Sequence, residues 1–135
     1  VTVPCENLTF CGTANISYSD TSELDAALAR RFEVCLFYDY DPEKERELTQ
    51  EKVGLDTAQR ICKVAKKIRE QYRAGRLPYP LDTGSVLNWA SLIERGMDFA
   101  EAAQLTWLYR IVEKDGQGYP EAGQLSAIKD LIAQS

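Results

Sequence analysis

The stretch TAQRICKVAKKIREQYRA, residues 57–74, carries the clearest periodic pattern in this sequence of 135 residues. Its apolar residues recur at the spacing that places them on one face of an α-helix. These residues are Ile61, Val64, Ala65, Ile68 and Tyr72. Gly75 follows, at a position where glycine commonly ends a helix. The pattern therefore predicts an amphipathic helix with one face in a core.

Further helices are expected on both sides of this one. A highly charged helix is predicted over 43–53, with Pro42 suited to its first position. The segment 85–95 is apolar nearly all round, so we expect it to be central. The remaining predicted helices run from an Asp98 cap to about residue 113, and onward from Tyr119-Pro120. Residues 42–135 are thus expected to form a helical bundle with Trp89 and Trp107 in its core.

Basic residues are concentrated in the strongest helix and the link after it. They are Lys63, Lys66, Lys67, Arg69, Arg73 and Arg76. The simplest interpretation is a solvated face, because the opposite face of the same helix is apolar. A binding role would require these charges to converge with exposed aromatic side chains.

The first forty residues have a different pattern. Two short segments rich in β-prone residues, 8–13 and 32–38, flank a short helical pattern over 22–30. This order suggests two parallel strands joined by a crossover, with ligands beyond their carboxyl ends. The predicted fold is mainly α, in which residues 1–41 form the C-terminal part of an α/β core and 42–135 a helical domain.

Composition excludes some functions and compartments. The net charge of −5 argues against a nucleic-acid coat, which needs clustered Lys and Arg. No run of about 18 apolar residues and no secretion signal is found, so we expect a cytoplasmic protein. The start at Val1 suggests a piece of a longer gene product.

Histidine is absent and the four cysteines form no C-x-x-C pair, so no metal site is expected. Cys11 and Cys35 are expected to be small buried side chains.

Three segments, GTAN (12–15), YSDTSEL (18–24) and ALARRF (27–32), are informative in their order and spacing. Together they resemble the second half of the ATPase core of MoxR-like AAA+ proteins, particularly the CbbQ/NorQ branch. The family pattern is roughly A-T-x-N-P-x-Y-x-G-T and then L-x-x-A-L-x-x-R-F. Ile16 and Asp20 depart from it. The resemblance covers the whole chain, because the family continues with a small helical lid.

The resemblance implies catalytic roles for three residues. Asn15 matches sensor 1, which orients the attacking water near the γ-phosphate, although an Asn after a strand is also a common turn residue. Arg31, just before Phe32, matches the arginine finger that reaches a neighbouring subunit's nucleotide. Arg30 is the second choice. Both arginines could instead stabilise a helix C-terminus, by about 0.3–1 kcal/mol.

The resemblance also places cofactor-binding residues at Thr83 and Gly84. The segment LDTGSVL, residues 81–87, resembles the family stretch L-S-T-R, whose arginine is sensor 2. Gly84 stands at that position, so the contact to the γ-phosphate would be lost. The alternative is that Gly84 only allows a tight turn into the helix. Thr83 or Asp82 can cap that helix, expected from Ser85 onward.

The implied parent is an ATPase that uses ATP and Mg²⁺, forms a homo-oligomeric ring and remodels a partner protein. The chain itself has no G-x-x-x-x-G-K-[ST] loop, so it is expected to bind no cofactor and to be inactive alone. No membrane or nucleic-acid partner is expected. The alternative is a non-catalytic helical module that docks another protein, with both arginines structural.

Overall fold

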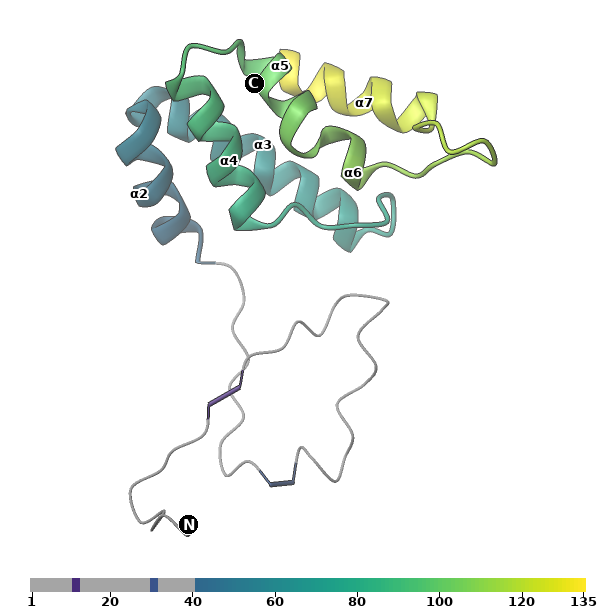
Figure 1. The fold of residues 1–135 in the computed structure, drawn as a ribbon, viewed down its shortest axis with the longest axis horizontal. Coiled ribbons are helices and arrows are strands. Elements are labelled where there is room, and N and C mark those ends of the chain that lie inside the picture. The colour runs from purple at the N-terminus through teal and green to yellow at the C-terminus, as the bar shows by residue number, and fades with distance from the viewer. Residues whose placement is uncertain (1–10, 13–29, 32–40) are drawn as a thin grey trace, which may run out of the picture. The chain divides into compact units, whose positions relative to one another are not determined.

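The computed structural model describes residues 11–12, 30–31 and 41–135, and every structural statement concerns those residues. The chain divides into two compact units, Val1–Tyr38 and Asp39–Ser135. The two strands expected over 8–13 and 32–38 and the helix expected over 22–30 fall largely outside the described residues. The described helices lie in the second unit (Figure 1).

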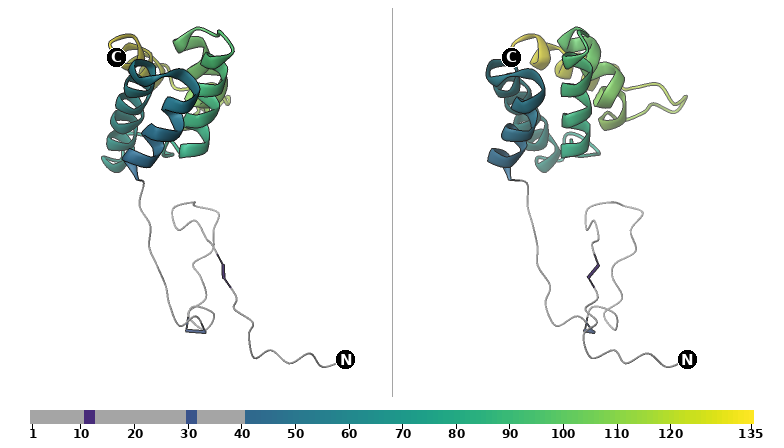
Figure 2. Two further views of the ribbon diagram at one scale, coloured as in Figure 1. Left: turned by 90° about the vertical axis from the view of Figure 1, so that its left-hand side faces the viewer. Right: turned by 60° about the vertical axis from the view of Figure 1, so that its left-hand side comes forward.

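The described part of the second unit consists of helices and their links, with one isolated antiparallel bridge between Lys114 and Pro120. This confirms the mainly α prediction for this part of the chain. The helices are α2 (Pro42–Val53), α3 (Leu55–Arg73), α4 (Thr83–Glu94), α5 (Phe99–Ala103), the π-helical turn η1 (Gln104–Leu108), α6 (Tyr109–Ile111) and α7 (Ala122–Ala133). Two groups of helices share α3 (Figure 2): α2 packs on α3 and α4, whereas α7 packs on α3 and α5.

Local signals explain most helix boundaries. Asp41 caps α2 by accepting from the backbone N–H groups of residues 43 and 44, and Pro42 occupies the first helical position as predicted. Gly75 ends α3 with a φ of 69°. Its N–H donates to the carbonyl of Tyr72, and the next N–H donates to the carbonyl of Gln71. This pair of bonds is a Schellman motif, which requires the left-handed conformation that glycine adopts readily.

The helix expected from Asp98 to about residue 113 is not one regular helix. Asp98 is the cap, as predicted, but the helix passes through the π turn η1 and ends at Ile111. Three consecutive side chains, Thr106, Trp107 and Leu108, are buried there. A regular α-helix would spread them over more than half its circumference, so the wider turn accompanies an unusually broad buried face.

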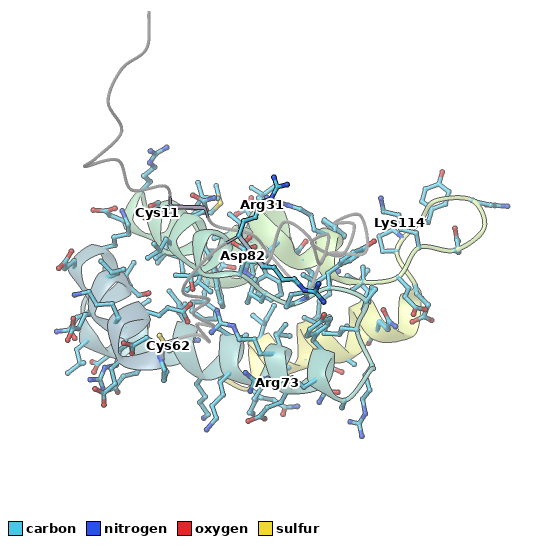
Figure 3. The ribbon with its side chains drawn as sticks, turned by 90° about the horizontal axis from the view of Figure 1, so that it is seen from below. Cys11, Arg31, Cys62, Arg73, Asp82 and Lys114 are labelled. Carbon is cyan, nitrogen blue, oxygen red and sulfur yellow. The ribbon has the colours of Figure 1, made fainter. Side chains whose placement is uncertain are left out.

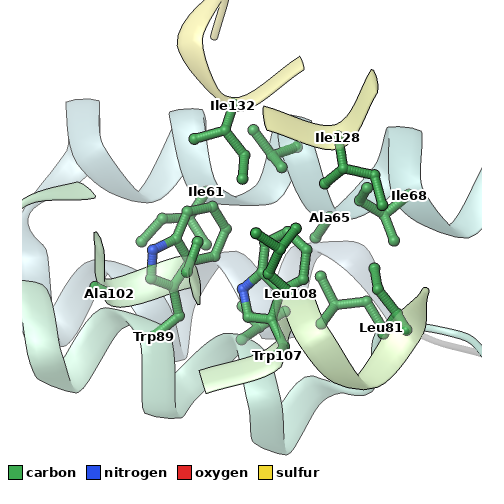
Figure 4. Close-up of a cluster of buried hydrophobic side chains, with 14 of the residues drawn as sticks. Ile61, Ala65, Ile68, Leu81, Trp89, Ala102, Trp107, Leu108, Ile128 and Ile132 are labelled. Atoms are coloured by element: carbon green, nitrogen blue, oxygen red, sulfur yellow. The ribbon is translucent and has the colours of Figure 1, made fainter. Parts of the chain in front are cut away.

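The core lies between the two groups of helices. Of the apolar face predicted for α3, Ile61, Val64, Ala65 and Ile68 are fully buried, whereas Tyr72 is only partly buried. Trp89 and Trp107 are also buried, as predicted, and their rings meet edge to face with centroids 5.3 Å apart (Figure 4). The side chains of Ile128 and Ile132 reach this core from α7. Helices far apart in sequence therefore share one apolar centre.

Candidate functional site at the start of α4

The basic face of α3 is not wholly solvated. Lys63, Lys66, Lys67 and Arg73 are exposed, as is Arg76 in the following link. Arg69 is the exception, because only 8% of it is exposed. The prediction that all six residues form a solvated face is therefore wrong for Arg69. Its position next to Ile68 puts it at the edge of the apolar face, where a charged side chain can turn inward if a partner is present.

The partner of Arg69 is Glu45 of α2. The guanidinium nitrogens Nη1 and Nη2 donate to Oε1 and Oε2 of Glu45 at 2.9 and 2.7 Å. The remaining nitrogen, Nε, donates to the carbonyl of Leu81 at 2.8 Å. Thr83 completes the group, because its hydroxyl donates to Oε2 of Glu45 at 2.7 Å. We call Glu45, Arg69, Thr83 and the Leu81 carbonyl the buried polar cluster.

This cluster connects three helices at one point. Its two charges are removed from water, which costs several kcal/mol for each ion unless the pair is well formed. The bidentate geometry and the additional bonds offset that cost. The sequence pattern did not single out Glu45, although this residue lies one helical turn before Leu48 and Thr49 and shares their face of the helix. Thr49 is also buried. The cluster fixes α2 and the first turn of α4 relative to α3.

Cys62 of α3, labelled in Figure 3, lies close enough to the buried polar cluster to interact with Glu45 and Arg69. Burial raises the pKa of its thiol, and the negative charge of Glu45 raises it further, while a contact with Thr49 acts in the opposite direction. A raised pKa keeps the sulfur protonated and a poor nucleophile. Cys11, in contrast, is exposed, so the expectation that it is buried is wrong. Cys35 lies outside the described residues.

The first turn of α4 begins two residues earlier than predicted, at Thr83. Asp82 is its cap: Oδ1 accepts from the N–H of Ser85 at 2.8 Å, and Oδ2 accepts from the Ser85 hydroxyl at 2.8 Å. A negative charge is thus already present at this helix N-terminus, where it interacts favourably with the helix dipole. The Thr83 hydroxyl is also engaged, by Glu45.

Gly84 is exposed, and the nearby Asp82 side chain helps to explain why a glycine stands at this position. A Cβ atom added there would lie 3.0 Å from Oδ1 of Asp82, the oxygen that caps the helix. That approach is closer than an ordinary van der Waals contact, so a larger residue requires the capping carboxylate to shift. The steric reason applies whether or not the position corresponds to sensor 2.

The predicted catalytic residues belong to the first unit. Arg30 and Arg31 form a turn and are both exposed. Asn15 lies outside the described residues. Within the described ranges, no three His, Cys, Asp or Glu side chains are arranged to hold a metal ion. In that same part of the chain, no helix is both long enough and apolar enough to cross a membrane.

The second unit is a helical domain in which the capped helix α4 is fixed against α2 and α3. This arrangement fits the lid of an AAA+ protein. Comparison with protein families supports this class. The sequence pattern described as CbbQ/NirQ/NorQ C-terminal matches residues 45–133. The chain therefore belongs to the CbbQ/NirQ/NorQ C-terminal family, a domain of AAA+ ATPases. A search among curated proteins found no match.

Proposed function

We propose that the chain is the C-terminal part of a longer AAA+ ATPase that couples ATP hydrolysis to the remodelling or activation of a partner protein. The family match over 45–133 carries this proposal. In it, residues 42–135 are the lid and residues 1–41 are the end of the ATPase core. The phosphate-binding loop and the magnesium ligands would lie in the preceding sequence, so nucleotide chemistry requires the parent protein.

Arg31 is the proposed arginine finger, with Asn15 as sensor 1. A guanidinium can offset the negative charge that the transferred phosphoryl group carries in the transition state. The exposure of Arg31 supports this role, since a finger must reach a neighbouring subunit. Arg30 is equally exposed and adjacent, which makes it a matched control. Such a finger implies that the parent forms a homo-oligomer.

The first experiment measures ATP turnover by the parent protein carrying Arg31→Ala or Arg30→Ala. We expect Arg31→Ala to lower turnover by about 1,000-fold or more, the lower end of arginine-finger effects, with nucleotide affinity nearly unchanged. Arg30→Ala should have a much smaller effect. Equal losses in the two variants would remove the finger role from Arg31. Steady turnover by the purified 135-residue chain alone would contradict the assignment itself.

Gly84 is proposed to stand where related lids carry sensor 2. A glycine side chain offers no charge, so this lid should respond weakly to the γ-phosphate. Gly84→Arg in the parent should then strengthen discrimination between ATP and ADP. Gly84→Ala is the matched control, because it brings the same Cβ toward Asp82 without the charge. If both variants leave an already strong discrimination unchanged, the sensor 2 assignment fails.

A further inference from the structure

A groove lies between the end of α3 and α7, and it shares no residue with the buried polar cluster. Its floor is apolar, formed by Ile68, Leu77, Ile128 and Leu131. Ile68 and Ile128 lie next to each other where α3 faces α7 (Figure 4). The hollow has a volume of about 440 Å³, within the usual range of ligand pockets. It is large enough to accept one or two apolar side chains.

Two small residues open this groove on the α7 side. Gly123 and Ala127 are four positions apart on one helical face, and both are exposed. Larger side chains at these positions would extend over the hollow. Leu131 continues the same face one turn further on, where it is half-buried. The groove therefore has its apolar part toward the middle of α7.

The other end of the groove is polar and basic. Arg76 lines it, and Nη1 of Arg76 donates to the side-chain carbonyl of Gln71 at 3.2 Å. Gln124, also in the lining, donates from Nε2 to the backbone carbonyl of Arg76 at 3.2 Å. Among residues 41–135, no carboxylate forms an ion pair with Arg76. A cation with only a neutral partner is available to an incoming anion.

Arg76 is the one charged side chain among the described residues that line the groove, which favours a carboxylate at the same end. Lys67 is exposed four residues before Gln71, on the same face of α3. Glu121, the cap residue before α7, is not among the lining residues, and its two oxygens accept from the N–H groups of Gly123 and Gln124 at 2.9 and 2.6 Å. Arginine binds carboxylates through two parallel hydrogen bonds, a geometry that a neutral amide replaces poorly.

We propose that this groove binds a segment of another protein in which a carboxylate and apolar side chains lie close together in sequence. The carboxylate would pair with Arg76, and the apolar side chains would lie over Ile128 and Leu131. The area is small, so the interaction is of the weak, transient class. This inference does not depend on the ATPase proposal, because it concerns only the surface of the second unit.

The test uses the full 135-residue chain, labelled with ¹⁵N and titrated with a synthetic peptide, acetyl-EELLAL-amide. We expect chemical-shift changes at the Arg76 side chain, the Gly123 amide and the Gln124 side-chain amide. A peptide with Gln in place of both Glu residues should bind about ten-fold more weakly, and so should one with Ser in place of the Leu residues. Equal binding of the charged and neutral peptides would overturn the proposal.

Protein variants provide the second half of the test. Arg76→Glu should abolish binding, and Ala127→Leu should weaken it by filling the groove, while helical circular dichroism is unchanged because both sites are exposed. Arg95→Glu, an exposed arginine beyond α4, is the charge-matched control and should bind normally. Normal binding by Arg76→Glu would overturn the proposal. So would shifts at the same resonances on raising the concentration of the chain alone, because a second copy would then be the occupant.

Discussion

The corner where α2 meets α3 and α4 and the centre where α4 meets η1 are both closed to solvent, but different chemistry closes them. Glu45 and Arg69 are joined at the corner by directional, charged hydrogen bonds. Trp89 and Trp107 meet at the centre through apolar surface and ring edges. The corner depends on both partners being present in one geometry, whereas the centre depends mainly on filled volume.

This difference is most important for α2, whose surface is largely polar. Its buried residues are Glu45 and Thr49, and its apolar residues Leu48 and Val53 are only partly buried. The buried polar cluster therefore contributes much of what holds α2 in place. The other helices can rely on apolar burial, which is non-directional and worth roughly 25 cal/mol per Å².

The largest expected effect comes from breaking the polar corner on one side. Arg69→Met removes the guanidinium but leaves the Glu45 carboxylate buried without its ion-pair partner. We expect a loss of about 3–5 kcal/mol in the free energy of unfolding, measured by urea denaturation of the 135-residue chain.

The double variant Glu45→Met with Arg69→Met separates charge burial from packing. Removing both charges together should recover most of the loss, because two apolar side chains of similar length can fill the corner. Additive losses in the double variant would mean that the pair contributes through packing and not through compensated charge. The comparison between corner and centre would then fail.

An intermediate effect is expected in the apolar centre, where the two tryptophans differ in one hydrogen bond. The Trp89 Nε1 group donates to the carbonyl of Phe99 at 2.9 Å. The buried Nε1 of Trp107 has no partner among the described residues. Replacing either ring with Phe removes the same volume. Trp89→Phe should therefore destabilise the domain more than Trp107→Phe, by about 1 kcal/mol. Equal losses in denaturant unfolding would show that volume alone decides.

The smallest effect is expected for polar contacts at the surface. It tests whether the contacts at the polar corner are important because they are buried. Hydrogen bonds from the N–H groups of Glu101 and Ala100 lower the pKa of Asp98 below its ordinary value. A lowered pKa in the folded state means that this cap stabilises the domain above the ordinary pKa, near 4, and loses its contribution as the pH falls through the lower value.

Asp98→Asn keeps an oxygen that can cap α5 but removes its titration. The variant should show a flatter decline in melting temperature below about pH 4 than the unmodified chain. Glu121, whose pKa is lowered by the N–H groups of Gln124 and Gly123, still titrates in both proteins. The difference between the two melting curves therefore reports Asp98 alone. Identical acid profiles would indicate that the Asp98 cap does not contribute.

Much of the helical domain follows from local sequence signals. The spacing of apolar residues over 57–74 predicts the buried face of α3, and Gly75 predicts its end. The caps Asp41 and Asp98 act within a few residues of their own position. The family could also be recognised from sequence, and the match over 45–133 confirms it. The roles of Asn15, Arg30 and Arg31 stay predictions.

Only the tertiary structure decides which charged residues are buried. Helical period places Arg69 at the boundary between the two faces of α3, where either orientation is possible. Its inward orientation depends on Glu45, 24 residues earlier on another helix, and on the carbonyl of Leu81. The polar end of the α3–α7 groove likewise needs Arg76 and Gln124, which are 48 residues apart. Local patterns cannot contain such pairings, because a charge is stable inside a protein only when a distant partner is brought within hydrogen-bond distance.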